Sequence, residues 1–339
     1  MKLNLVLGCG WRSIVIVSSA PLRVSFSGGG SDYKQHYEKH GGAIFGSAIN
    51  KRVYVFVNPL SKFSNENIRF TYRITESVGS LETLKHPVVR ETLKIFGIRS
   101  NINIATLSDL PGNTGLGSSS AFTVALIKAL AIYSGSNLTR DEIWRLAYRI
   151  EREILGETGG IQDHLHATYG GLRYYNFSAN EFHYSEDLIT ESLRSIFKSQ
   201  ALLFRIGEER QSELVASKTL LSIQDPLKLL EIKKSADIAS TSYREFIKSD
   251  SYVEKFKIIG DAINQNWKSK VQFQNTTNQS LEERIDSLRS LGGISFKVCG
   301  AGNTGFLLTL FDSDKSQLSS EINVEGFELD SRGVESLEF

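Results

Sequence analysis

The sequence predicts an α+β protein with two domains, and three observations support this prediction. The chain has 339 residues, and at roughly 100–200 residues per domain this length corresponds to two domains or one large one. Segments with strand periodicity and segments with helix periodicity follow one another in mixed order, which favours α+β over a regular βαβ alternation. The 28 glycines, against 5 prolines, gather in three clusters beside these segments. We place the domain boundary near residue 195, so the predicted domains are 1–195 and 196–339.

The composition argues against several classes of protein. With 40% hydrophobic and 23% charged residues, the chain has the values of an ordinary globular protein. Its 39 Lys and Arg against 38 Asp and Glu give a net charge of +1, and nucleic-acid binding rests on a basic surface, so no nucleic-acid partner is expected. The two cysteines, Cys9 and Cys299, lie far apart and supply neither a disulfide framework nor a structural zinc site. We therefore expect a protein of the reducing cytoplasm.

The N-terminal segment begins somewhat like an export signal, with Met1-Lys2 followed by an apolar run, but we do not expect it to act as one. Its apolar run, residues 3–8, is shorter than the roughly 7–15 residues that such a signal needs. No other stretch approaches the length of a membrane span, so no membrane partner is expected. Residues 1–19 form either an extra strand or an extension ahead of the first motif, and the sequence leaves both open.

The first half of the chain contains predicted strands followed by predicted helices. Apolar and polar residues alternate from Leu22 to Phe26, which is typical of a half-buried strand. Thr139 and Glu142 form a capping-box pattern at the start of a helix. Further strands are predicted at 43–57 and 102–107, and helices at 121–133 and 139–155.

The second half is predicted to be mostly helical over 190–290, with strands at 295–298 and 306–310. The connection between these strands, Gly300 to Gly305, formally matches the Gly-x-Gly-x-x-Gly dinucleotide fingerprint. A true fingerprint opens a helix in a βαβ unit, whereas here a strand is predicted to follow. A nicotinamide dehydrogenase is therefore not expected.

The segment Pro111-Gly-Asn-Thr-Gly-Leu-Gly-Ser-Ser-Ser-Ala121 is the most informative glycine cluster. It leads into a predicted helix, where glycines let the backbone approach a ligand and the helix N-terminus adds partial positive charge. This pattern predicts a phosphate-binding loop, and a structural turn with a serine N-cap is the alternative. It is not the common P-loop, because no Gly-Lys-Ser/Thr follows the glycines.

Together the three clusters resemble the three motifs of the GHMP kinases, the superfamily of galactokinase, homoserine kinase, mevalonate kinase and phosphomevalonate kinase. The similar segments are Ala20-Pro-Leu-Arg-Val-Ser-Phe-Ser-Gly-Gly-Gly-Ser-Asp-Tyr33, Pro111–Ala121 and Lys297-Val-Cys-Gly-Ala-Gly-Asn-Thr-Gly305. They occur in the family's order across nearly the whole chain. The resemblance implies an N-terminal mixed α/β ATP-binding domain and a C-terminal ferredoxin-like α/β domain, with the active site in the cleft between them.

Within this superfamily the motifs are most similar to those of the bacterial heptose 7-phosphate kinases. The similar residues are Gly28–Asp32, Gly117–Val124, Gln162-Asp163 and Tyr169–Gly171, with Gly207, Arg210, Trp267 and Lys270 as weaker matches. Galactokinases carry Gly-Glu-His-Thr-Asp in place of Gly28–Asp32, which argues against galactose. The chain departs from the family pattern at Asn303-Thr304, usually a glycine pair, and at His164, where glutamine is common.

The resemblance implies a role for each matching residue. Asp163 corresponds to the base that faces the acceptor hydroxyl, and Arg23 to a cation that keeps this carboxylate ionised. A loop cap for Asp163 and a surface ion pair for Arg23 are the alternatives. ATP is expected at the second motif, through Pro111, Gly112, Gly115, Leu116, Gly117, Ser118, Ser119 and Ser120.

Magnesium and the acceptor complete the expected site. Ser119 and Glu151 correspond to the family's Mg²⁺ ligands, and few protein ligands are needed because phosphates and waters supply the rest. The acceptor is expected at Asp32, Gly29, Gly30, Ser31, Gly300 and Gly302. A sugar phosphate also needs a cation for its distal group, and the candidates are Lys51, Arg52, Arg73 and Arg210, of which family position favours Arg210.

The resemblance thus implies a cytoplasmic ATP-dependent kinase acting on the anomeric hydroxyl of D-glycero-D-manno-heptose 7-phosphate, for nucleotide-activated heptose and surface polysaccharide. An anomeric hydroxyl is more acidic than an ordinary alcohol, so a carboxylate base is sufficient. The alternatives are another sugar 1-kinase, for fucose or galactose, and a non-catalytic sugar or nucleotide sensor on the same fold. The joint presence of Asp163, Glu151 and Ser119 favours the enzyme. The sequence does not indicate an oligomeric state.

Overall fold

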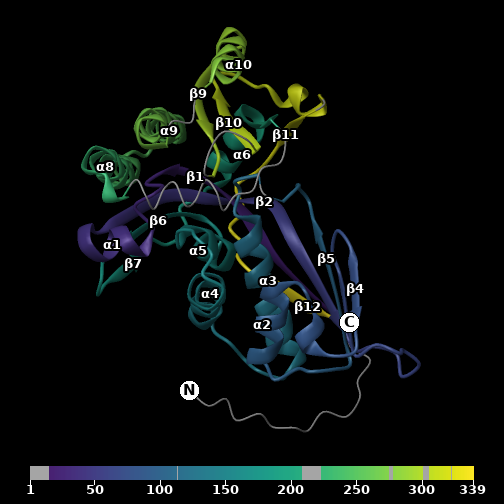
Figure 1. The fold of residues 1–339 in the computed structure, drawn as a ribbon. Coiled ribbons are helices and arrows are strands. Elements are labelled where there is room, and N and C mark those ends of the chain that lie inside the picture. Colours follow the sequence, from purple (N-terminus) through teal and green to yellow (C-terminus); the bar gives the residue numbers. More distant parts are fainter. Residues whose placement is uncertain (1–14, 113, 208–222, 275–277, 301–304, 322) are drawn as a thin grey trace.

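The computed structural model describes residues 15–112, 114–207, 223–274, 278–300, 305–321 and 323–339. Strands of the described residues form two sheets, one of eight strands and one of four. Figure 1 shows helices packed against both sheets. The predicted α+β class is therefore confirmed.

The large sheet is built on two long strands, β1 (Ile16–Ser27) and β2 (Gly42–Asn58), which pair antiparallel. The strands run in the order β12-β1-β2-β5-β3-β4, and β6 and β7 extend the sheet from the other end of β2. Strand β1 confirms the strand expected at Leu22–Phe26, but most of it is buried on both faces rather than half-buried. The remaining strands are β3 (Ile68–Thr71), β4 (Thr75–Val78), β5 (Ile102–Ser108), β6 (Leu172–Phe177), β7 (Phe182–Tyr184) and β12 (Glu335–Glu338).

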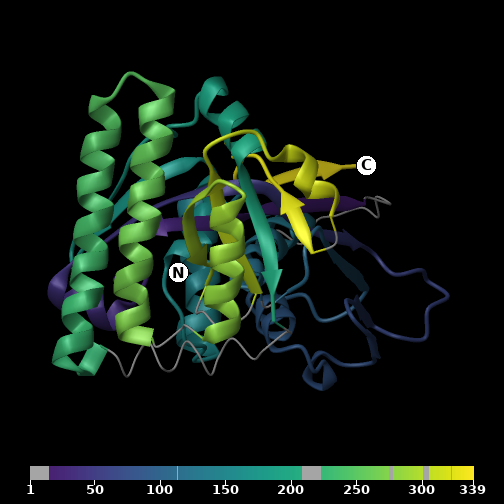
Figure 2. The ribbon, with the colours of Figure 1, turned by 90° about the horizontal axis from the view of Figure 1, so that it is seen from above.

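Helices cover the two faces of this sheet, which explains the double burial of β1. On one face lie α3 (Ser118–Tyr133) and α5 (Gln162–Tyr169), both in contact with β1. On the other lie α8 (Pro226–Lys248) and α9 (Tyr252–Gln274), an antiparallel pair seen from above in Figure 2. The other helices beside the large sheet are α1 (Lys34–His40), η1 (Leu81–Thr83), α2 (Pro87–Ile95), α4 (Arg140–Tyr148) and the π-helical turn η2 (Arg149–Ile154).

Helix α4 begins where the sequence predicts it. The Thr139 hydroxyl accepts a hydrogen bond from the Glu142 amide, and the Glu142 carboxylate accepts one from the Thr139 amide, so the capping box is complete. This reciprocal pairing satisfies amides that the first turn leaves without a helical partner. The helix predicted to run to residue 155 changes to π-helical geometry at Arg149.

The small sheet contains four antiparallel strands in the order β11-β8-β10-β9. Numbered by their place in the chain, the four strands lie side by side in the order 4-1-3-2. This is the arrangement of a split βαβ unit. The helical prediction for 190–290 holds for α6, α8, α9 and α10 but misses β8, whose buried residues Ala201–Phe204 show no alternation. The elements of this part are α6 (Glu191–Gln200), β8 (Ala201–Ile206), α10 (Gln279–Ser290), β9 (Gly293–Val298), β10 (Gly305–Phe311), η3 (Ser316–Ser320) and β11 (Val324–Gly326).

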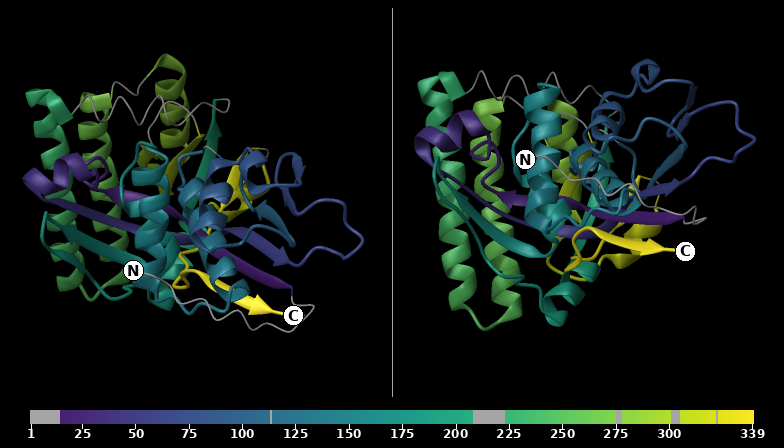
Figure 3. Two further views of the ribbon diagram at one scale, coloured as in Figure 1. Left: turned by 60° about the horizontal axis from the view of Figure 1, so that its bottom comes forward. Right: turned by 90° about the horizontal axis from the view of Figure 1, so that it is seen from below.

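The C-terminal residues return to the large sheet. Strand β12 pairs with the start of β1, as Figure 3 shows. The buried guanidinium of Arg52 holds this return in place, because it lies 2.7 Å from an Asp330 carboxylate oxygen and donates to the Gly333 carbonyl at 2.7 Å. The predicted domain boundary at 195 falls within α6, between the last strand of the large sheet in this region and the first of the small sheet. It stays a prediction.

No helix among the described residues is long and apolar enough to cross a membrane.

Candidate active site

The second and third glycine clusters touch through their backbones. A Cβ added at Gly115 would collide with the carbonyl of Cys299 and the Cα of Gly300, and one at Gly305 would collide with the carbonyl of Thr114. Gly115, Gly300 and Gly305 also have positive φ values of 79°, 65° and 109°. Only glycine combines this conformation with so close an approach. The two loops that the sequence singles out therefore belong to one site, although Gly302 and Asn303-Thr304 lie outside the described residues.

Arg23 and Asp163 form a close ion pair beside the second motif. Arg23 Nε donates to Asp163 Oδ1 at 2.7 Å, and Nη2 lies 2.6 Å from the same oxygen. Arg23 Nη1 donates to the Gly115 carbonyl at 2.7 Å, and the Arg23 amide donates to the Leu116 carbonyl at 3.0 Å. Only 7% of the Arg23 side chain is exposed, so this is not a surface ion pair. One arginine thus joins β1, the glycine loop and α5.

Gly117 brings the start of α3 against this ion pair. It is the N-cap of α3, with φ of 77°, and a Cβ there would lie 3.3 Å from Asp163 Cγ and 3.4 Å from Arg23 Cγ. The amides in the first turn of a helix have no partner within the helix. Since α3 is 16 residues long, its N-terminus places these amides and a partial positive charge beside Asp163. Ser118 is half-buried and Ser119 is exposed in this turn.

Asp32 links the first motif to the start of α5. Its Oδ1 accepts a hydrogen bond from the Gly30 amide at 3.1 Å, and its Oδ2 accepts one from the Gln162 amide at 3.3 Å. The carboxyl is buried, and this burial together with the negative charge of Asp163 raises its pKa. A side chain at Gly160 would collide with the Asp32 carboxyl. The predicted acceptor and catalytic carboxyls therefore lie close to each other, with Asp163 the more accessible.

The rest of the first motif is held as a tight turn. The Ser31 hydroxyl donates to the Gly28 carbonyl at 2.7 Å, and the Ser31 amide donates to the same carbonyl at 3.1 Å. Gly28 and Gly30 have positive φ values of 93° and 94°, which favour glycine. The Gly29 carbonyl accepts from Ser235 of α8 at 3.3 Å. Ser31 is buried and Gly29 is half-buried, so Ser31 shapes the turn.

Glu151 lies in the π-helical turn and is fully buried. Its carboxylate accepts hydrogen bonds from the Ser120 hydroxyl at 2.9 Å and the Thr123 hydroxyl at 2.5 Å, and it lies 2.9 Å from His164 Nε2. Arg152 Nη2 is 3.3 Å away. Burial alone would raise the pKa of Glu151, but the charge and hydrogen bond of His164, together with Arg152 and Thr123, outweigh it and lower the pKa to about 2.

The predicted magnesium ligands do not face a common space. Ser120, not Ser119, contacts Glu151, and Ser119 is on the exposed side of α3. Among the described residues, no group of three or more His, Cys, Asp or Glu side chains is arranged to hold a metal ion. The Glu151 carboxylate is already surrounded by donors, so the pair Ser119 and Glu151 does not fit a magnesium ion in this structure.

Two buried lysines beneath the third motif were not predicted as site residues. Lys297 of β9 donates to the carbonyls of Ser25 and Phe26 at 2.8 and 3.1 Å, and Lys270 of α9 donates to those of Val298 and Gly300 at 2.7 and 2.5 Å. Burial lowers the pKa of both ammonium groups, that of Lys270 to about 7. The sequence carried a signal for each of them, since Lys297 begins the segment similar to the third motif and Lys270 is one of the weaker matches to the heptose 7-phosphate kinases. The Lys297 bonds join the small sheet to β1, and the Lys270 bonds join α9 to the start of the third motif loop.

The predicted cations for a distal phosphate lie in different places. Lys51 pairs with Glu325, and Arg52 forms a buried ion pair with Asp330, which we call the Arg52–Asp330 clasp. Because both side chains already neutralise carboxylates of this chain, neither is placed to bind a phosphate. The Arg73 guanidinium comes within 3.7 Å of where a Gly112 Cβ would lie, near the second motif. Arg210 lies outside the described residues.

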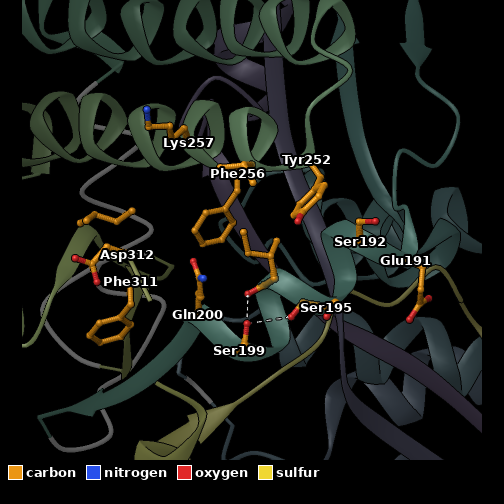
Figure 4. Close-up of a pocket in the computed structure, with 13 residues that line it drawn as sticks. Glu191, Ser192, Ser195, Ser199, Gln200, Tyr252, Phe256, Lys257, Phe311 and Asp312 are labelled. Carbon is orange, nitrogen blue, oxygen red and sulfur yellow. Dashed lines mark hydrogen bonds between the residues drawn. The ribbon is translucent and has the colours of Figure 1, made fainter. Parts of the chain in front are cut away.

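A pocket of about 810 Å³ lies elsewhere, between α6, the start of α9 and the end of β10. Figure 4 shows Tyr252, Phe256 and Gln200 around it, with the Ser199 hydroxyl bonded within α6. None of the predicted site residues lines this pocket. The candidate active site is therefore at the meeting point of the glycine loops.

Comparison with known proteins shows that this chain is similar to kinases, including the region that contains the second glycine cluster. Residues 82–171 match the family model of the GHMP kinases N terminal domain. The D-glycero-alpha-D-manno-heptose 7-phosphate kinase of Campylobacter jejuni is 28% identical over 328 residues, covering 88% of this chain and 90% of that protein. The mevalonate kinase of Archaeoglobus fulgidus is 26% identical over 313 residues, covering 91% and 97%.

A solved structure shows the same fold. The crystal structure of a D-glycero-D-manno-heptose 1-phosphate kinase from Bacteriodes thetaiotaomicron superposes with a TM-score of 0.72 at 20% identity, covering 95% of this chain and 98% of that one. The kinase relatives and the domain match together indicate an ATP-dependent sugar kinase. The match to the GHMP kinases N terminal domain and the kinase relatives agree with the predicted family, and the predicted α+β fold and enzyme class are confirmed.

Proposed function

We propose that the chain transfers the γ-phosphoryl group of ATP to the anomeric hydroxyl of D-glycero-D-manno-heptose 7-phosphate, giving the 1,7-bisphosphate. The single observation that carries the proposal is the Arg23–Asp163 pair beside the N-terminus of α3. Both contacts from Arg23 go to Oδ1 of Asp163, so Oδ2 is the oxygen that Arg23 does not bind. The Campylobacter jejuni heptose 7-phosphate kinase, similar over most of both chains, supports the choice of acceptor.

The proposed reaction uses Asp163 as the general base. Its Oδ2 accepts the proton of the acceptor hydroxyl while the hydroxyl oxygen forms a bond to the γ-phosphorus. The bond from the γ-phosphorus to the bridging oxygen of ADP breaks, and ADP leaves with that electron pair. Arg23 holds the Asp163 carboxylate in place through Oδ1 and balances charge on the attacking oxygen.

The proposed nucleotide site is the segment from Pro111 to Ser120, where the glycine backbone and the α3 amides face the same region as Asp163. Amides at a helix N-terminus favour phosphate oxygens. Mg²⁺ accompanies ATP in this proposal and is held by phosphates and water, with the exposed Ser119 hydroxyl as the protein ligand. Such an ion neutralises phosphate charge.

The proposed acceptor site is formed by Asp32 with Gly29, Gly30, Ser31, Gly300 and Gly302, and Arg210 is proposed to hold the distal phosphate. We also propose that the protein works in the cytoplasm, where ATP and sugar phosphates are available, and serves the supply of nucleotide-activated heptose for surface polysaccharide.

The test is an ATP-coupled activity screen of the purified protein with heptose 7-phosphate, mannose 6-phosphate, fucose, galactose and mevalonate. We expect the highest kcat/KM with heptose 7-phosphate. Preference for an unphosphorylated sugar would overturn both the heptose assignment and the role of Arg210. The absence of turnover with every acceptor, despite ATP binding, would favour a non-catalytic sensor.

Mevalonate is the second candidate acceptor because several mevalonate kinases, such as that of Archaeoglobus fulgidus, are 22–26% identical over about nine-tenths of this chain. A preference for mevalonate in the same screen would establish this candidate instead.

A further inference from the structure

Four side chains from three helical elements converge on Glu151. Ser120 and Thr123 come from α3, Arg152 from the π-helical turn and His164 from α5. Glu151 and His164 are completely buried. Because a carboxylate can only accept hydrogen bonds, His164 Nε2 carries the hydrogen in this contact. The cluster of these five residues is called here the Glu151 clamp.

The donor set leaves little room for a metal ion on Glu151. A carboxylate has about four acceptor positions, and four donors already approach this one. Mg²⁺ requires oxygen ligands at about 2.0–2.1 Å in near-octahedral geometry, so it would have to displace several of them. The displaced His164 would then be buried without its acceptor, which is energetically costly.

We propose that Glu151 is a positioning residue of this kinase rather than a magnesium ligand, and that with His164 it holds the first turn of α5 so that Asp163 meets Arg23. The proposal rests on the role proposed above for Asp163. It adds a function for His164, one of the positions at which this chain departs from the family pattern.

The geometry of α5 links the Glu151 clamp to Asp163. Neighbouring residues on a helix point about 100° apart. Asp163 therefore bonds toward Arg23 on β1, while His164 bonds toward Glu151 and α3. Two successive side chains held in different directions fix the rotation of a helix about its axis. Without the His164 bond, the Asp163 carboxylate loses one of the two restraints on its orientation.

The first test compares two substitutions of His164. His164→Leu removes the donor, and we expect kcat to fall by about 10–100-fold, as for loss of groups that orient a reactive residue, with KM for ATP unchanged. His164→Gln keeps an N–H donor and is expected to restore most of kcat. His166→Leu is the matched control, because His166 is equally buried on the same helix and neither of its ring nitrogens has a described partner. Wild-type kcat in His164→Leu would overturn the proposal.

The second test asks directly whether Glu151 binds metal. Mn²⁺ binding to the protein with ADP is measured by electron paramagnetic resonance for wild type and Glu151→Gln. We expect the same Mn²⁺ dissociation constant in both, with kcat lowered about as much as in His164→Leu. A weakening of Mn²⁺ binding by tenfold or more in Glu151→Gln would overturn the proposal. If Glu151→Gln does not fold, Thr123→Val is used in its place, since it removes one donor and no charge.

The double variant His164→Leu/Glu151→Gln separates this proposal from the proposed function. Because the two residues act as one unit, we expect the double variant to lose no more thermal stability and no more kcat than the more affected single variant. Additive losses would overturn the proposal. If the wild type phosphorylates no sugar phosphate, the proposed function fails, but the Mn²⁺ measurement and the thermal-stability cycle still test the Glu151 clamp.

Discussion

At the residue scale, Asp163 and Arg23 are the pair on which the proposed chemistry depends. The pair is only partly accessible, because 7% of the Arg23 and 24% of the Asp163 side chain is exposed. The sequence predicted both residues, yet it offered only the family match for their contact, since they are 140 positions apart. The two loop carbonyls that also bind Arg23 could not be predicted from residue type, because every residue carries such a group.

Asp163→Asn is expected to lower kcat by about 10²–10⁴-fold, the usual contribution of a general base, while ATP still binds at the second motif. The measurement is steady-state kinetics with calorimetric titration of ADP. Glu325→Gln serves as control, because Glu325 is a half-buried residue of β11 that pairs with Lys51, and this variant is expected to keep wild-type kcat. Unchanged turnover in Asp163→Asn would remove Asp163 as the base.

Lys270 should make the stability of the fold depend on pH. Burial lowers its pKa from 10.5 to about 7, so between these values the unfolded chain binds a proton that the folded chain does not. Stability therefore rises with pH across this window, by at most about 1.4 kcal/mol per pH unit, and is independent of this group below pH 7. Urea unfolding from pH 7 to 9.5 should show a steeper rise for wild type than for Lys270→Met. Parallel curves would contradict the prediction.

At the element scale, the contact between the second and third motifs depends on glycine. Gly115→Ala is expected to lower kcat/KM by at least about tenfold, since a misplacement of about 1 Å costs 10²-fold and the added Cβ meets the Cys299 carbonyl. Gly135→Ala is the control, because Gly135 has a similar φ of 70° but nothing within 4 Å of an added Cβ. In both variants alanine is placed at a positive φ, which costs about 1–2 kcal/mol of stability, and urea unfolding measures this loss. Equal activities would show that the close contact is unimportant.

Helix α3 shows how far an element can be predicted. Its start at Ser118 and its end at Tyr133 agree with the expected helix at 121–133 after the serines. Which serine faces Glu151 was not predictable. The turn that carries Glu151 is π-helical, and such a turn inserts an extra residue into the helix. This changes the direction in which Glu151 points without leaving a signal in the hydrophobic pattern.

At the scale of the whole molecule, the buried clasp of Arg52 and Asp330 stabilises the return of the C-terminal residues to the large sheet. Arg52→Met is expected to lower the free energy of unfolding by about 3–5 kcal/mol, because it leaves the buried Asp330 carboxylate with only the exposed Arg332. Lys198→Met, which breaks an exposed pair with Glu328, should cost no more than about 1 kcal/mol. Chemical unfolding compares the two. An equal loss of unfolding free energy in both variants would mean that the buried Arg52–Asp330 pair stabilises the fold no more than an exposed pair does. The KM for ATP should be unchanged in both variants.

The sequence by itself determined the local features of this protein: the strand leading into the first glycine turn, the capping box of α4, the glycine loop before α3, and the strand rather than helix after the third motif. These depend on neighbouring residues through hydrogen bonds and backbone conformations that short segments specify. Only the tertiary structure decided that Ser120 rather than Ser119 meets Glu151, that Arg52 is buried in a clasp, and that the chain's end joins β1. Such contacts join residues far apart in sequence, and they arise from packing and from the burial of charge, which no local pattern encodes.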